Sequence, residues 1–190
     1  MKKIFIVDTD QKTIYSLQNL FRSKGYQVQT ARNVMECLPQ IIKFKPDLVL
    51  VSYESWGQSC FEKARRIEKV TPAAVLFIVK DVNDMFMNGL QGLKVYSYLK
   101  RPVSLAEVLR TSEFAMNSVK KLNTLQNELS KLEKSLENRK YVERTKILFM
   151  QKFELDESEA YAKLRRMSMD QGLPIHELCQ YMLEELNEEQ

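Results

Sequence analysis

Residues that commonly build disulfides, metal sites and nucleophilic active sites are scarce in this sequence. Its 190 residues include three cysteines and one histidine. Cys37, Cys60 and Cys179 are far apart and have no C-x-x-C spacing, which argues against a disulfide framework or a zinc site and predicts buried thiols. His176 has no plausible nucleophile partner. We therefore expect no metal, no cofactor and no enzymatic activity.

Long hydrophobic runs are also absent. The apolar run Ile4–Val7 is too short for the hydrophobic region of a signal peptide, and no later segment has the length of apolar residues that a membrane span needs. We expect a cytoplasmic protein without membrane contact. With 44% hydrophobic and 28% charged residues, the chain has enough apolar side chains to bury a core. Its length favours one domain with an appendage.

The first half of the sequence alternates short apolar runs with segments of helical periodicity. The predicted strands are Ile4–Val7, a run around Val28, Leu48–Val51, Val75–Val79 and Val95–Leu99. Segments such as Thr13–Lys24 and Phe61–Val70 carry apolar residues three and four positions apart. Five strand-helix units in about 120 residues predict an α/β, flavodoxin-like domain with a five-stranded parallel sheet in the order 2-1-3-4-5.

The second half has neither glycine nor proline between Pro102 and Gly172, which predicts long helices. Ser104 and Glu107 form an S-x-x-E capping box that starts the first of them. Leucines then recur at spacings of three and four, as in a coiled-coil heptad: Leu122, Leu125, Leu129, Leu132 and Leu136. We predict a coiled-coil helix at residues 119–138 that forms a homodimer. The alternative is an amphipathic helix folded back onto its own domain.

Two further helices are expected near the C-terminus. Asp156 is placed to cap the first turn of a helix, where its carboxylate can accept hydrogen bonds from free amides. Gly172 and Pro174 then mark a stop and a restart before a final helix near Ile175–Leu186.

Two stretches of this helical region resemble the ANTAR domain, a three-helix RNA-binding module of bacterial transcription antiterminators. Residues 139–150 read RKYVERTKILFM and residues 157–169 read ESEAYAKLRRMSM, which follows the family's pattern at nearly every position. Thr145 and Ile147 depart from it, because the family usually has alanine and glycine there. The resemblance implies that residues 139–190 bind tandem stem-loops in leader RNA and so prevent formation of a terminator hairpin.

Basic and aromatic side chains of this region are the predicted RNA-binding residues. Lys140 and Arg144 lie four residues apart, as do Tyr161 and Arg165, so each pair shares one face of a helix. Arginine can pair with phosphate or base edges, and tyrosine can stack on a base. The predicted set is Arg139, Lys140, Arg144, Lys146, Tyr161, Arg165 and Arg166. In the alternative, Glu143, Glu157 and Glu159 neutralise these cations and the surface is merely solvated.

Three segments of the first half, residues 6–10, 45–52 and 98–104, resemble the receiver domain of bacterial response regulators. In working receivers they supply two acids for magnesium, an aspartate that accepts the phosphoryl group, and a lysine before a cis-proline. In this sequence Asp8 and Thr9 stand at the positions of the two acids, and Ser52 stands at the position of the acceptor. Arg101 stands at the position of the lysine, and Val79 at that of the switch hydroxyl after the fourth strand. The resemblance therefore implies that residues 1–118 form a receiver fold that has lost its usual phosphorylation site.

Two side chains offer substitutes for the lost acceptor. Ser52 could be modified by another kind of kinase, although no recognition sequence surrounds it. Glu54 lies two residues further on, and we expect it to point away from the acceptor position.

Control by a protein partner, or by the abundance of the protein, is the predicted replacement for phosphorylation. The resemblance includes antiterminators that a ligand-sensing protein holds inactive. Tyr53 and Trp56 are candidate docking residues on the receiver-like domain, or else they pack over the vacated pocket. Two other functions stay open. One is a DNA-binding response regulator, although no helix-turn-helix spacing follows residue 155 and the last helix is acidic. The other is a protein-interaction adaptor.

Overall fold

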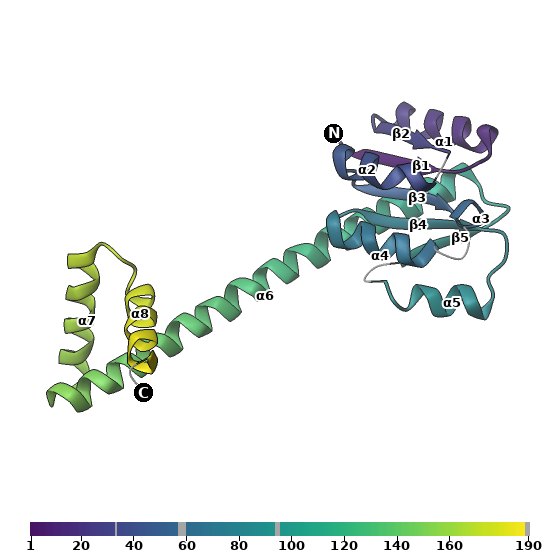
Figure 1. Ribbon diagram of the computed structural model, residues 1–190. Coiled ribbons are helices and arrows are strands. Elements are labelled where there is room, and N and C mark those ends of the chain that lie inside the picture. Colours follow the sequence, from purple (N-terminus) through teal and green to yellow (C-terminus); the bar gives the residue numbers. More distant parts are fainter. Residues whose placement is uncertain (33, 57–59, 94–95, 189–190) are drawn as a thin grey trace. The chain divides into compact units, whose positions relative to one another are not determined.

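The computed structural model describes residues 1–32, 34–56, 60–93 and 96–188. The chain divides into two compact units, Met1–Thr124 and Leu125–Gln190. Helix α6 (Leu105–Phe153) contributes residues to both units (Figure 1). Among the described helices, none combines the length and the apolar character of a membrane span.

The first unit is built on a five-stranded parallel sheet in the order β2-β1-β3-β4-β5. The strands are β1 (Lys3–Val7), β2 (Gln27–Ala31), β3 (Leu48–Ser52), β4 (Ala74–Val79) and β5 (Tyr96–Lys100). The predicted fold class and strand order are thus confirmed.

Helices cover both faces of this sheet (Figure 1). They are α1 (Gln11–Ser23), α2 (Val34–Phe44), α4 (Cys60–Val70), α5 (Asp84–Leu90) and the beginning of α6. A single helical turn, α3 (Tyr53–Trp56), follows β3 directly and was not among the predicted elements. Gly25, with a φ of 81°, follows the end of α1, as its sequence position suggests.

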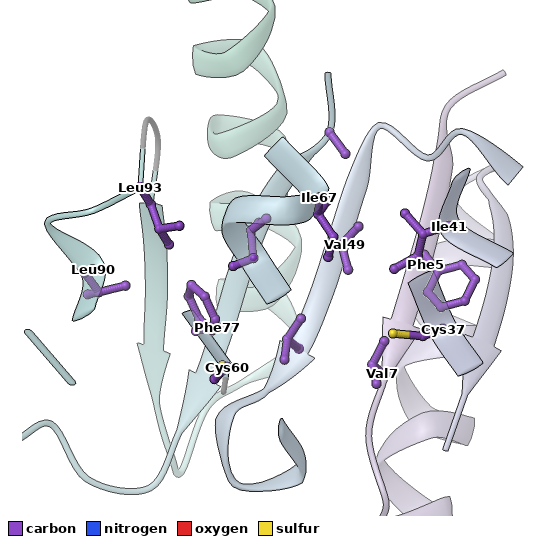
Figure 2. Close-up of a cluster of buried hydrophobic side chains, with 14 of the residues drawn as sticks. Phe5, Val7, Cys37, Ile41, Val49, Cys60, Ile67, Phe77, Leu90 and Leu93 are labelled. Atoms are coloured by element: carbon purple, nitrogen blue, oxygen red, sulfur yellow. The ribbon is translucent and has the colours of Figure 1, made fainter. Parts of the chain in front are cut away.

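Two hydrophobic clusters form the core, one on each face of the sheet. Successive side chains of a strand point to opposite faces, so Ile4 and Ile6 pack with α1 and α6, whereas Phe5 and Val7 pack with α2 and α4. Figure 2 shows part of the second cluster. Every residue of β3 and β4 is buried, which explains why these strands read as unbroken apolar runs.

All three cysteines are buried thiols outside any disulfide, as their spacing predicted. Cys37 and Cys60 lie in the cluster drawn in Figure 2, and burial raises their thiol pKa values from 9.0 to about 11 and about 12 respectively. Cys179 lies in the core of the second unit, where burial also raises its thiol pKa.

The second unit consists of the C-terminal part of α6 with α7 (Glu157–Gln171) and α8 (Ile175–Glu188). Its core contains Phe149, Ala160, Leu164 and Cys179. The three predicted helices are present.

Capping residues set the ends of these helices. The Asp156 carboxylate accepts a hydrogen bond from the Glu159 amide at 2.8 Å, and the Glu159 carboxylate accepts one from the Asp156 amide at 3.1 Å. Gly172 ends α7 in the left-handed conformation, with a φ of 66°. Ser104 and Glu107 form the equivalent box before α6.

The junctions between the predicted segments 1–118, 119–138 and 139–190 fall inside the single helix α6. No break in the backbone marks either junction, so these bounds stay a prediction.

Candidate functional site

Six of the seven predicted RNA-binding side chains are exposed in the second unit. They are Arg139, Lys140, Arg144, Tyr161, Arg165 and Arg166. Among the described residues, none of them makes an ion pair or a side-chain hydrogen bond, so their polar groups are available to a ligand. Pairing with glutamates, one part of the sequence alternative, therefore does not apply to these six, while RNA binding by them stays a prediction beside a merely solvated surface.

The three glutamates named in that alternative have other partners. Glu143 and Glu157 both contact the Lys146 ammonium, each at 2.7 Å. Glu159 completes the capping box of α7. The acidic side chains are thus used within the fold.

Lys146 differs from the rest of the predicted set because it is 8% exposed. The hydrogen bonds from Glu143 and Glu157 raise the pKa of its ammonium group. This cation joins α6 to the first turn of α7, and its geometry fits a role in holding the two helices together.

The exposed residues occupy more than one face. Lys140 and Arg144 are four apart on α6, and Tyr161 and Arg165 are four apart on α7, so each pair lies on one side of its helix. Arg166 follows Arg165 directly and therefore points about 100° further around α7. The predicted set is distributed over several helix faces.

Sequence reasoning did not select Lys152 or Lys163. Both line a pocket together with Phe149 and Phe153. Phe153 is 43% exposed. The adjacent pair Lys152-Phe153, directly after the stretch 139–150, was the sequence signal that could have indicated a contact site.

The leucine seam is largely exposed. Leu125, Leu129, Leu132 and Leu136 are each between 52% and 64% exposed, and Leu122 is half-buried. In an isolated helix this row of leucines would leave apolar surface in contact with water, which is unfavourable.

The receiver-like site lies at the carboxyl ends of β1, β3 and β5. Asp8 and Ser52 are 2% and 4% exposed. The Arg101 guanidinium donates to the Asp8 carboxylate at 3.1 Å and to the Ser52 hydroxyl at 3.4 Å. The Arg101–Pro102 peptide is cis. A cation from the chain itself thus pairs with the remaining acid, and Val79 offers no hydroxyl.

Glu54 does not point away from Ser52, which corrects the expectation from its sequence position. The Ser52 hydroxyl donates to the Glu54 carboxylate at 3.3 Å, and the Lys80 amide donates to the same carboxylate at 2.6 Å. The reason is helix α3, which turns the chain back over the site directly after β3. Strand alternation therefore does not apply at this position.

Comparisons with known proteins agree with both halves of this description. The model of the ANTAR domain matches residues 130–183. Those residues form an ANTAR domain. The match begins nine residues before the stretch quoted from the sequence, so it includes part of the leucine seam.

Relatives extend over most of the chain. The transcriptional regulatory protein PdtaR of Mycobacterium tuberculosis is 25% identical over 190 residues, which covers 97% of this chain and 91% of that protein. Protein PilH of Pseudomonas aeruginosa is 27% identical over 114 residues, covering 58% of this chain and 94% of that protein. A CheY-like receiver domain from Methanospirillum hungatei has a TM-score of 0.56 at 19% identity, covering 64% of this chain and 98% of that one.

The chain therefore combines a receiver fold with an ANTAR domain. PdtaR, which matches nearly the whole chain, is named a regulator of transcription. The architecture supports RNA binding in transcription antitermination by a response-regulator-like protein.

The two departures from the ANTAR pattern have different surroundings. Thr145 is buried, and its hydroxyl lies 2.9 Å from the Tyr141 carbonyl and 3.3 Å from the Cys179 carbonyl, so it can bond within α6 or across to α8. Ile147 is 50% exposed on α6. Ile147 therefore changes the exposed surface of the ANTAR domain, whereas Thr145 changes its interior and part of the lining of a pocket.

Of the two candidate docking residues on the receiver fold, Tyr53 is half-buried. Its ring packs against Phe86 with centroids 5.0 Å apart and against Phe61 at 5.8 Å. Tyr53 thus packs on the core of the receiver fold, and its part in docking stays a prediction. The side chain of Trp56 lies outside the described residues.

Proposed function

We propose that this protein is an RNA-binding regulator of transcription antitermination. A homodimer binds tandem stem-loops in leader RNA and prevents the terminator hairpin from forming. The observation that carries the proposal is the group of six exposed basic and aromatic side chains on the ANTAR domain, while the nearby glutamates are occupied elsewhere in the fold.

The type of target follows from the chemistry of these residues. Guanidinium and ammonium groups bind phosphate, and unstacked bases in RNA loops can stack on tyrosine or hydrogen-bond to arginine. Tyr161 and Arg165 offer both on one face of α7. A duplex presents fewer exposed base faces, so hairpin loops are the favoured target.

Two RNA hairpins fit a dimer. Exposed leucines at heptad spacing provide a surface on which a second copy can pack. The dimer would present two ANTAR domains, one for each stem-loop. We place the coiled coil at residues 119–138, between a receiver domain at 1–118 and an RNA-binding domain at 139–190.

Phosphorylation at the usual aspartate has no part in this proposal. Ser52 occupies that position, and Arg101 neutralises Asp8. Control by a protein partner that binds the receiver fold, or by the abundance of the protein, takes the place of a phosphorylation switch. The protein is proposed to act in the cytoplasm, where leader transcripts are made.

Binding to selected RNA tests the proposal. A pool of tandem hairpins with randomised loops is enriched on the full-length protein. The most enriched RNA, a scrambled version of it and duplex DNA are then each titrated with the protein at two salt concentrations. We expect RNA-selective binding that Arg165→Ala weakens by about tenfold, the value of one good base or phosphate contact. Arg22→Ala, which removes the same charge from an exposed position on α1, should bind as the wild type does.

The alternatives predict other outcomes. Preference for duplex DNA would favour a DNA-binding response regulator. Equal, strongly salt-dependent binding to all three nucleic acids would indicate nonspecific charge. No binding at all would favour a protein-interaction adaptor.

A further inference from the structure

A pocket of about 370 Å³ opens within the ANTAR domain between α6, α7 and α8. Its lining residues include Phe149, Phe153, Met167 and Met182, with Lys152 and Lys163 among them. The size falls in the range that small ligands occupy. A mostly apolar wall that also carries two ammonium groups suits a flat, uncharged ring attached to an anion.

The phenylalanine rings are arranged to offer such a ring a place. Their centroids are 5.1 Å apart in an edge-to-face arrangement. Phe149 is 7% exposed, whereas Phe153 is 43% exposed. An aromatic side chain left this open loses part of its burial free energy, so an occupant that covers it gains stability from the contact.

The ammonium of Lys163 lies over this pair, 3.6 Å from the Phe153 centroid and 5.8 Å from that of Phe149. Among the described residues, Lys152 and Lys163 have no acidic partner. Lys146, by contrast, has two. Glu185 is the acid of the lining. The lining thus carries two ammonium groups and one carboxylate, and this excess of positive charge attracts an anion.

A second copy of the chain is a less suitable occupant. An apolar protein surface would cover the ammonium groups of Lys152 and Lys163 and take them out of water without a counter-charge, which is unfavourable. A nucleotide covers the rings with its base and meets the ammonium groups with its phosphates.

We infer that this pocket receives one unpaired loop base of the RNA, which takes the place of the flexible Lys163 side chain on the Phe153 ring, with the adjoining phosphate on Lys163 or Lys152. This inference rests on the RNA-binding function proposed above. It adds a contact of a different kind, an apolar base pocket beside the exposed basic faces of α6 and α7.

A double-mutant cycle tests it with the RNA selected from the randomised hairpin pool. Each loop nucleotide is replaced in turn by an abasic one, and each RNA is titrated against the wild type and Phe153→Leu. We expect Phe153→Leu to weaken binding about tenfold. At one loop position, removal of the base should cost the wild type a similar factor and the variant almost nothing.

Four further measurements make the result decisive. Tyr181→Leu changes an exposed aromatic residue of α8 outside the pocket and should leave RNA affinity unchanged. Lys163→Met keeps the apolar stem, and should lower the slope of log affinity against log salt by about one. Circular dichroism checks that each variant keeps its helices, and the more conservative Phe153→Tyr, which keeps a stacking ring, should retain affinity.

The opposing results are distinct. If abasic losses add to that of Phe153→Leu at every position, no base contacts this ring and the inference is wrong, while RNA binding stands. If Phe153→Leu alters the dimer in sedimentation but not RNA affinity, the occupant is a second copy. If the pool yields no RNA preferred over duplex DNA, the proposed function and this inference both fail.

Discussion

The Arg101 guanidinium donates a hydrogen bond to the Asp8 carboxylate at 3.1 Å across the carboxyl edge of the sheet. In a working receiver, acids at this edge hold magnesium and a lysine contacts the phosphoryl group. Here the cation pairs with the acid itself. The acceptor aspartate is absent, and the remaining charge of Asp8 is neutralised by Arg101. This ion pair contributes to the stability of the receiver fold.

Removal of this cation should destabilise the receiver fold. Asp8 is 2% exposed, so in Arg101→Ala a nearly buried carboxylate loses its charged partner and keeps only the hydrogen bond from the Asp10 amide among those described. We expect a loss of about 1–3 kcal/mol in the free energy of unfolding, the usual cost of leaving a charged hydrogen-bonding group unpaired. Arg101→Lys should lose less. Urea denaturation measures both, and an unchanged midpoint for Arg101→Ala would show that water satisfies Asp8.

Chemical phosphorylation of the receiver fold should fail. A serine hydroxyl cannot form an acyl phosphate, and the Glu54 carboxylate, 3.3 Å from the Ser52 hydroxyl, repels an approaching phosphate donor. Incubation with acetyl phosphate and magnesium should therefore leave the mass of the intact protein unchanged, while a receiver with an aspartate acceptor serves as the positive control. A phosphoryl group mapped to Ser52 or Glu54 would contradict this expectation.

Periodicity predicted the fold well because two simple patterns dominate it. The buried strands β3 and β4 read as unbroken apolar runs, and alternation along β1 divides Ile4 and Ile6 from Phe5 and Val7. Caps at Ser104 and Asp156 fix helix starts by local hydrogen bonds that need only four residues. These signals depend only on residues close together in the chain, so they can be recognised from the sequence alone.

The candidate site was less predictable because its contacts join residues that are far apart in the chain. Lys146 looked like the other cations of its helix, yet its pairing with Glu157 depends on how α7 packs against α6. Glu54 contacts Ser52 because of the single helical turn α3, which is too short to be predicted from the periodicity of apolar residues. The pocket of Phe153 and Lys163 likewise needs three helices to be placed before it exists.

Native cysteines should react slowly with alkylating agents. All three are buried, and the pKa values of the Cys37 and Cys60 thiols are raised by burial to about 11 and about 12. At pH 8 iodoacetamide should label the native protein more than about a hundredfold more slowly than urea-unfolded protein, because reaction requires unfolding. Rapid labelling of any cysteine, located by mass spectrometry, would contradict its burial.

The same thiols predict the sign of a pH effect on stability. Their folded-state pKa values lie above the ordinary 9.0, so the unfolded chain releases these protons first as the pH rises. Their contribution to stability is complete below pH 9 and is lost between about pH 9 and 12. Urea denaturation across this range should give a falling free energy of unfolding, and Cys60→Ala should make the fall shallower.

The buried departure from the ANTAR pattern should matter for stability and the exposed one should not. Thr145→Ala removes a hydroxyl that bonds to a carbonyl of α6 or α8, and we expect a loss of about 1 kcal/mol in the free energy of unfolding. Ile147→Ala, at a 50% exposed position, should change it by less than about 0.5 kcal/mol. Thermal melts measure both. Weaker RNA binding by Ile147→Ala alone would place Ile147 in the interface.

Disruption of the leucine seam should separate dimer formation from RNA binding. Leu125 and Leu132 are 52% and 64% exposed and lie on one face of α6, where lysines would place like charges together in a dimer. We expect Leu125→Lys with Leu132→Lys to sediment as a monomer. The matched control, Asn127→Lys with Ser130→Lys, adds the same charge away from the seam and should stay dimeric. The monomer should bind a two-hairpin RNA no better than a one-hairpin RNA, because only a dimer gains from a second linked site. A proven monomer that still prefers two hairpins would mean that one ANTAR domain contacts both.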